Sequence, residues 1–219
     1  ELPVIDAHHH LWSSPPQRPG ERYLGEDFRR DATAGHRIIG SVFIESNFSW
    51  GNSGPRHLRP VAETEAVNAM AERAAKPGGD VIDCGFANAI VGHADFEPGE
   101  AVDAVLEAHI TAAPLRFRGV RQSNTWDAWD GLNYQRMKIP KRRLANPEYR
   151  RGLARLQNYD LSFDSWTFHT QLIEVFDLAT AFPGITIIVD HLGGPIGIGP
   201  YAGRRTEIGG SGGSGSTTG

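Results

Sequence analysis

Apolar runs rich in β-branched residues alternate along this chain with amphipathic stretches. Six of the runs have the length and composition of buried strands, and they cover residues 4–5, 38–44, 86–91, 117–120, 161–168 and 185–189. The amphipathic stretches predict helices at residues 61–76, 100–113, 146–156 and 170–182. Strands that alternate with helices indicate βαβ units and therefore an α/β fold with a parallel sheet.

A parallel sheet can close into a barrel or stay open with helices on both faces, and periodicity does not separate the two. No Gly-rich dinucleotide fingerprint follows the first predicted strand. Polar residues cluster just after several different strands, as they do in barrels whose active site is formed by the loops that leave the strands. We therefore favour a barrel. Two long loops, residues 47–60 and 123–145, leave strand ends and carry Trp50, Trp126 and Trp129, which we expect to shape a substrate pocket.

Composition narrows the class of protein. The chain has 219 residues, of which 39% are hydrophobic and 22% charged, as in an ordinary globular domain. Its net charge of −4 and the absence of a basic run argue against a nucleic-acid partner. A single cysteine, Cys84, and the lack of a long apolar stretch lead us to expect a cytoplasmic protein without a membrane span. Residues 209–219 are all Gly, Ser or Thr, so we expect one domain at 1–208 followed by a flexible tail.

Three consecutive histidines lie near the start of the chain, between an apolar run and Leu11-Trp12. Side chains two residues apart on a strand point the same way, so Asp6, His8 and His10 share one face. Imidazole is the commonest neutral metal ligand in proteins, and this face is therefore a candidate chelating edge. The alternatives are a remnant of a purification tag and a polar strand end.

Two further histidines follow predicted strands. His169 comes after the fifth strand, and alternation places it on the same face as Phe163, Ser165 and Thr167, which we expect to be the inner face. Spacing alone also allows a hydrogen-bonded surface histidine. His36 and His109 fall in helix-like segments, and we expect both at the surface.

The sixth strand leads into Asp190-His191-Leu192-Gly193-Gly194-Pro195. A histidine at this turn can act as a general base because the glycines let a ligand approach the backbone. Alternation along the strand points Asp190 to the opposite face from His191. A capped strand end without chemistry is the alternative.

Three segments together resemble the amidohydrolase-related family, and within it the branch of metal-dependent hydrolases that includes sugar-lactone and dicarboxylate lactonases. They are Ile5-Asp6-Ala7-His8-His9-His10-Leu11-Trp12, Phe117-Arg118-Gly119-Val120-Arg121-Gln122 and Val189-Asp190-His191-Leu192-Gly193-Gly194-Pro195. They occur in the family's order, and the likeness runs from Val4 to about Glu207.

The resemblance implies a (β/α)8 TIM barrel, of which this chain holds about six βα units. It also implies that His8, His10 and His169 bind one divalent metal ion, zinc in the first place and manganese as an alternative. His191 is then the base or polarises the substrate carbonyl. Some relatives hydrolyse lactones without a tightly held metal, so metal-free catalysis is the other expectation.

Four more positions match the family pattern after other strands. They are Glu45, His93, Arg121 and Gln122. Arg121 is the candidate catalytic arginine, because a guanidinium presents a planar fork to a substrate carboxylate or to charge on a carbonyl oxygen. The other three are candidate substrate-binding residues, and a local salt bridge or a loop anchor is the alternative for each.

The resemblance implies a hydrolase that opens a lactone or related cyclic carbonyl compound on a small, carboxylate-bearing substrate. A non-oxidative decarboxylase using the same site is the alternative. The family's barrel has two more strands, and the last carries an Asp that binds metal or activates water in many members. A third hypothesis is therefore a catalytically inactive partial barrel that pairs with another chain, for example as a homo-oligomer.

Overall fold

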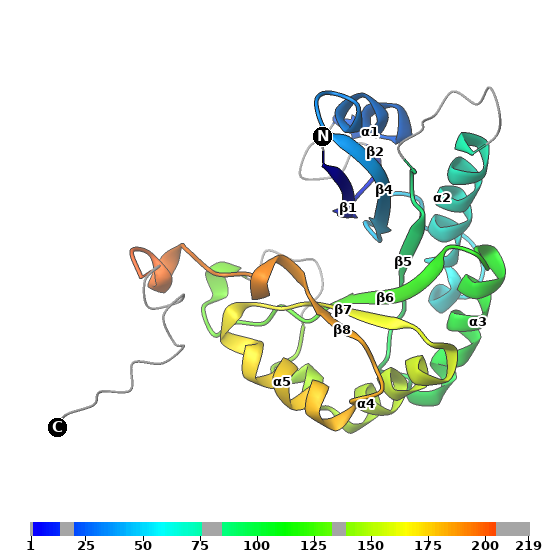
Figure 1. The fold of residues 1–219 in the computed structure, drawn as a ribbon. Coiled ribbons are helices and arrows are strands. Elements are labelled where there is room, and N and C mark those ends of the chain that lie inside the picture. The colour runs from blue at the N-terminus through cyan, green and yellow to red at the C-terminus, as the bar shows by residue number, and fades with distance from the viewer. Residues whose placement is uncertain (1, 14–19, 76–84, 133–138, 205–219) are drawn as a thin grey trace.

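A curled sheet of six parallel strands forms the centre of the molecule (Figure 1). The computed structural model describes residues 2–13, 20–75, 85–132 and 139–204. The strands lie side by side in chain order and are β1 (Pro3–His9), β4 (Arg37–Ile44), β5 (Ala89–His93), β6 (Phe117–Ser123), β7 (Ser162–Trp166) and β8 (Ile187–Val189). Helices connect successive strands, so the architecture is a partial TIM barrel, as predicted.

Five α-helices accompany the sheet within the described residues. They are α1 (Gly25–Ala32), α2 (Val61–Ala74), α3 (Asp103–Ala112), α4 (Pro147–Ala154) and α5 (Leu172–Ala181). Asn146 caps the start of α4, because its side chain accepts a hydrogen bond from the backbone N–H of Glu148. Helix α1 was not predicted, because it is short and buries only Phe28 and Ala32. A small antiparallel pair, β2 (Trp12–Ser13) and β3 (Arg22–Tyr23), was also missed.

The predicted strands are confirmed with shifted ends. The third begins later than expected, because Phe86 and Ala87 form a turn in which Ala87 has a φ of 46°. Cys84 and the expected domain boundary at 208–209 lie outside the described residues. Within the part of the chain that the structure describes, no helix is long and apolar enough to cross a membrane.

The main hydrophobic core lies between the sheet and the helices. Phe163 of β7 belongs to this core together with Leu178 of α5, so Phe163 faces the helices. The alternation that we predicted for this strand is therefore wrong, and Asp164 and Trp166 point to the concave side. A strand buried on both faces has no polar face to fix the direction of the alternation.

Both outer strands of the sheet leave apolar side chains accessible. Ile5 of β1 is 62% exposed, and Ile188 and Val189 of β8 are 43% and 40% exposed. On α5, Ile173 and Phe176 are 72% and 68% exposed. Each outer strand pairs with one neighbour within the described sheet, so its second row of backbone groups is available to another strand.

We expect these open edges to make the chain self-associate. Gel filtration over a range of concentrations should show growing size, and a dye that reports apolar surface should bind. Ile5→Lys places a charge on the β1 edge and should weaken association about tenfold. This factor is close to the free energy gained when one aliphatic side chain is buried.

Leu115→Lys is the matched control, since Leu115 is 77% exposed but lies between α3 and β6, away from both edges. Equal effects of the two substitutions would show that association does not use the edge of β1.

Candidate active site

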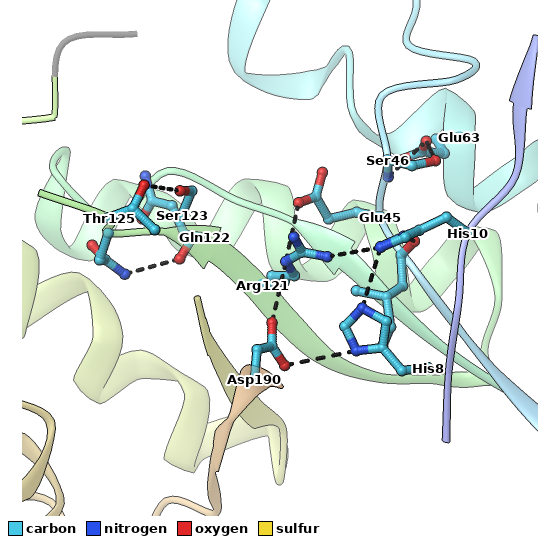
Figure 2. A network of polar contacts seen from close by, with 12 residues as sticks. His8, His10, Glu45, Ser46, Glu63, Arg121, Gln122, Ser123, Thr125 and Asp190 are labelled. Atoms are coloured by element: carbon cyan, nitrogen blue, oxygen red, sulfur yellow. Dashed lines mark hydrogen bonds and ion pairs between the residues drawn. The ribbon is translucent and has the colours of Figure 1, made fainter. Parts of the chain in front are cut away.

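Polar and charged side chains from four strands meet on the concave side of the sheet, at the carboxyl ends of the strands (Figure 2). His8 and His10 come from the end of β1, and Glu45 directly follows β4. Arg121 lies in β6, and Asp190 directly follows β8. In a parallel sheet all strands end at the same edge, which brings together residues from the two ends of the chain.

The two histidines of β1 are arranged as a chelating pair. Their Nε2 atoms are 3.2 Å apart, and His10 Nδ1 lies 2.8 Å from the carbonyl oxygen of Ile44. Nδ1 of His10 therefore donates to that carbonyl, which leaves the lone pair on Nε2. Two nitrogens that share one tetrahedral zinc ion, each about 2.0–2.1 Å from it, lie about 3.3 Å apart. The predicted common face of His8 and His10 is confirmed, whereas His9 packs on Phe28 in the core.

Both histidines are neutral at pH 7. Burial lowers the pKa of His8 to about 3, with contributions from His10, Arg121 and His191. Burial also lowers the pKa of His10 to about 4. Neutral imidazole is the form that binds metal ions, so the pair can take up an ion at pH 7 without releasing protons.

Arg121 stands between the histidines and the carboxylates. Its Nε lies 3.3 Å from Asp190 Oδ2 and 3.8 Å from Glu45 Oε1, and its Nη1 lies 3.4 Å from His10 Nε2. Asp190 Oδ1 lies 3.8 Å from His8 Nδ1. Asp190 was expected on the opposite face, and that expectation is wrong. Strand β8 ends at Val189 and the backbone turns with a φ of 51° at His191, so strand alternation stops there.

Carboxyl groups outnumber guanidinium groups among the buried and half-buried side chains of the site. Asp164 of β7 is 3% exposed and faces the same concave side, where burial, together with the charge of Asp190, raises its pKa to about 7. Burial also raises the pKa of Glu45 and of Asp190, although Arg121 opposes both shifts. Asp164 was missed by the sequence analysis. A lone Asp inside the apolar segment 161–168 was the available signal.

His191 joins this group. Single ligand atoms of His8, Asp190 and His191 all lie within 4.8 Å of one another, and the rings of His8 and His191 are 4.6 Å apart. The ring of Trp166 packs edge-on against His191 at 4.8 Å. His191 itself is exposed, so it is accessible to a substrate that enters from the concave side.

His169 lies in different surroundings. Its Nδ1 accepts a hydrogen bond from the backbone N–H of Ile196 at 3.3 Å, and its ring lies 5.2 Å from that of Tyr201. Strand β7 ends at Trp166, and His169 begins a short 3-10 helix. Among the described residues, the group that could hold a metal ion includes neither His10 nor His169, and the roles of both as ligands stay predictions.

His93 and Gln122 lie at the ends of β5 and β6. The His93 ring packs against Trp50 at 4.9 Å, and burial lowers the pKa of His93 to about 4. Gln122 is buried and donates from Nε2 to Asp95 Oδ1 at 3.0 Å. This hydrogen bond attaches the loop after β5 to β6, as expected if Gln122 is a loop anchor. Substrate binding by Glu45, His93 and Gln122 stays a prediction.

His109 is a buried structural residue, so the expectation that it lies at the surface is wrong. Its Nδ1 lies 2.8 Å from the hydroxyl of Thr64, and its Nε2 lies 3.0 Å from the carbonyl oxygen of His93. The ring stacks on Phe117 with centroids 4.8 Å apart. His109 thus ties α2 and α3 to the end of β5, beside the site. His36 is exposed, as expected, although it precedes β4 outside any helix.

His109 should make the fold sensitive to acid. Burial lowers its pKa to about 4, so the folded state excludes a proton that the unfolded chain binds below about pH 6.5. The stability from neutral His109 is complete above pH 6.5 and is lost as the pH falls toward 4. His109→Gln should make the slope of unfolding free energy against pH shallower by up to about 1.4 kcal/mol per pH unit in that window.

The measurement is urea unfolding at several pH values between 7 and 4.5. Carboxyls with raised pKa values, such as Asp164, act with the opposite sign, and they cancel when the variant is compared with the parent chain. His36→Gln is the control for the loss of one exposed histidine. The same slope in both variants would contradict the buried neutral state of His109.

Comparison with known proteins identifies the family of the chain. A family model described as amidohydrolase matches residues 5–207 of the chain. A protein called y4mH from Sinorhizobium fredii (strain NBRC 101917 / NGR234) is 28% identical over 211 residues, which are 88% of this chain and 63% of y4mH.

Solved structures show the same fold. An amidohydrolase from Burkholderia multivorans with bound zinc is 20% identical and superposes with a TM-score of 0.59, over 87% of this chain and 58% of that one. A probable 2-pyrone-4,6-dicarboxylic acid hydrolase from Acinetobacter baumannii, with citric acid bound, is 14% identical with a TM-score of 0.53, over 86% of this chain and 58% of that one. This chain therefore spans somewhat less than two thirds of the length of these proteins.

Proposed function

The chain belongs to the amidohydrolase family, whose model covers residues 5–207, and from this premise we propose that its site serves metal-assisted hydrolysis of a lactone or related cyclic carbonyl compound. The observation that carries the proposal is the facing pair of Nε2 atoms of His8 and His10, 3.2 Å apart. It is supported by the zinc bound to the Burkholderia amidohydrolase.

The residues present fit a divalent cation. His10 Nδ1 is tied to a backbone carbonyl and His8 Nδ1 faces Asp190, so both imidazoles direct Nε2 toward one point. Asp190, Asp164 and Glu45 supply three carboxyls around the single guanidinium of Arg121. The excess negative charge favours a cation at this place.

We assign the ion to His8 and His10, with Asp190 or the predicted His169 as further ligand. A divalent ion bound there supplies Lewis acidity, which polarises a carbonyl and lowers the pKa of water from 15.7 toward about 7. Zinc is the first candidate because neutral imidazoles suit it, and manganese is the second. Metal-free hydrolysis on the same residues is the alternative outcome.

The remaining roles fall to residues of this chain. The exposed His191 accepts a proton from the attacking water and returns it to the alcohol that leaves when the ring opens. Arg121 binds the substrate carboxylate or the charge that develops on the carbonyl oxygen, because its planar fork offers five N–H donors. The Acinetobacter protein is a probable hydrolase of a dicarboxylic acid, which supports an anionic substrate here.

The first test is the metal content of the purified chain by elemental analysis. We expect near-stoichiometric zinc or manganese, and less than about a tenth of it in a His8→Ala, His10→Ala double variant, because both proposed nitrogen ligands are lost. A His36→Ala, His57→Ala double variant removes two exposed histidines and should keep the metal.

Two single variants separate the possible further ligands. Loss of metal in Asp190→Asn with retention in His169→Ala assigns Asp190, and the reverse result assigns His169. Equal metal in the parent chain and in the His8, His10 double variant would contradict the site.

The second test is hydrolysis of lactones that carry or lack a carboxylate. Arg121→Lys should lower kcat/KM for the carboxylate-bearing lactone at least about tenfold, chiefly through KM, because an ammonium cannot form the paired contacts of a guanidinium. The neutral lactone should lose less. Arg118→Lys on the same strand is the control, since its guanidinium bonds to the carbonyls of Leu115 and Phe117, away from the site.

Product analysis distinguishes the reaction class. Ring opening without release of carbon dioxide supports hydrolysis, and carbon dioxide from a carboxylate-bearing substrate supports the decarboxylase. Equal losses for both lactones in Arg121→Lys would show that Arg121 does not select the substrate anion.

A further inference from the structure

A buried carboxyl group on α2 accepts hydrogen bonds from the loop that follows β4. Glu63 is 1% exposed. Its Oε1 accepts from the backbone N–H of Phe48 at 2.8 Å and of Ser46 at 3.2 Å, and its Oε2 accepts from the indole N–H of Trp50 at 3.3 Å. Figure 2 shows Glu63 beside Ser46, above His10 in this view. Burial, together with the charge of Glu45, raises the pKa of Glu63 to about 7, and the three N–H donors oppose this shift. A carboxylate only accepts hydrogen bonds and so matches all three donors, whereas the amide of Gln would present its own N–H group to one of them.

The same segment of chain reaches the active site at several points. The carbonyl of Ile44 orients His10, and Glu45 faces Arg121. The Ser46 hydroxyl donates to the carbonyl of Leu11 at 2.6 Å, directly after the histidine motif. Trp50 packs against His93. Residues 44–50 therefore contact three side chains of the site, which are His10, Arg121 and His93.

We propose that Glu63 is a positioning residue for the proposed hydrolysis: it fixes residues 44–50, and through them the orientation of the His10 ring and the place of Glu45. Glu63 does not touch the predicted ligands, and it acts through the backbone that it binds. The inference rests on the proposed function for its catalytic meaning, but the orientation of His10 can be measured without any reaction.

An ordinary loop anchor is the competing explanation. A residue of that kind would lower stability when changed but would leave the His10 ring and the affinity for metal as they are. Groups behind the ligands of a metal site typically change metal affinity by about 10–100-fold when they are removed. The two explanations therefore differ in a measurable quantity.

The experiment compares Glu63→Gln with Glu65→Gln in the full chain. Glu65 lies two residues away on α2 and is exposed, so it controls for the loss of one carboxylate from this helix. Amide hydrogen exchange of Ser46 and Phe48 reports the loop, and the ¹⁵N shifts of the His10 ring report its hydrogen bond to Ile44. Zinc affinity is measured by competition with a chromophoric chelator.

In Glu63→Gln we expect about tenfold faster exchange at both amides, changed His10 ring shifts and zinc binding weaker by about tenfold or more. In Glu65→Gln all three should match the parent chain. Unchanged His10 shifts and zinc affinity in Glu63→Gln, even with a loosened loop, would overturn the proposal in favour of a plain anchor.

Failure of the proposed function is a separate result. If the parent chain binds no zinc, the metal-assisted reaction fails, and the exchange and ring-shift data still decide the role of Glu63. If Glu63→Gln does not fold, Ser46→Ala replaces it, because this change removes only a hydroxyl, which contacts the carbonyl of Leu11 at 2.6 Å and Glu63 Oε1 at 3.4 Å. A shift of the His10 ring signals in Ser46→Ala supports the proposal, and unchanged signals overturn it.

Discussion

The guanidinium of Arg121 is the interaction on which the site depends, because it stands among carboxyls from three other strands. Glu45 follows β4, Asp164 lies in β7 and Asp190 follows β8. Each carboxyl is buried to a degree that raises its pKa, and Arg121 opposes the shift in all three. One buried cation among three acids is stable only if protons or a further cation balance the charge. The neutral histidines of β1, as the proposed ligands of such a cation, would add no charge of their own.

Much of this arrangement could be predicted from the sequence. The six strands and four of the helices follow from apolar periodicity, and three of the predicted helices end directly before a proline, at Pro77, Pro114 and Pro183. The histidines of β1 were identified from the alternation of side chains along a strand, and Arg121 from its match to the family pattern. His8 and His10 share a face for the simplest reason, which is the two-residue repeat of a strand.

Other features escaped because they depend on tertiary packing. In β7 both faces are buried, so the pattern could not show that Asp164 points inward. Asp190 was assigned to the wrong face because the left-handed turn at His191 ends the alternation. Glu63 and His109 sit on α2 and α3 at positions that read as ordinary polar helix residues. Only the structure shows that a loop and a strand end bind them.

The site also connects the first and last strands of the open sheet through their side chains. Strands β1 and β8 form opposite edges and do not pair (Figure 1). Yet His8 on the first edge lies 3.8 Å from Asp190 beyond the last, and its ring lies 4.6 Å from that of His191. The curl of the sheet brings these side chains together across the concave side. A cation bound by His8 and Asp190 would cross-link the two edges, so metal binding and the curvature of the sheet should stabilise each other.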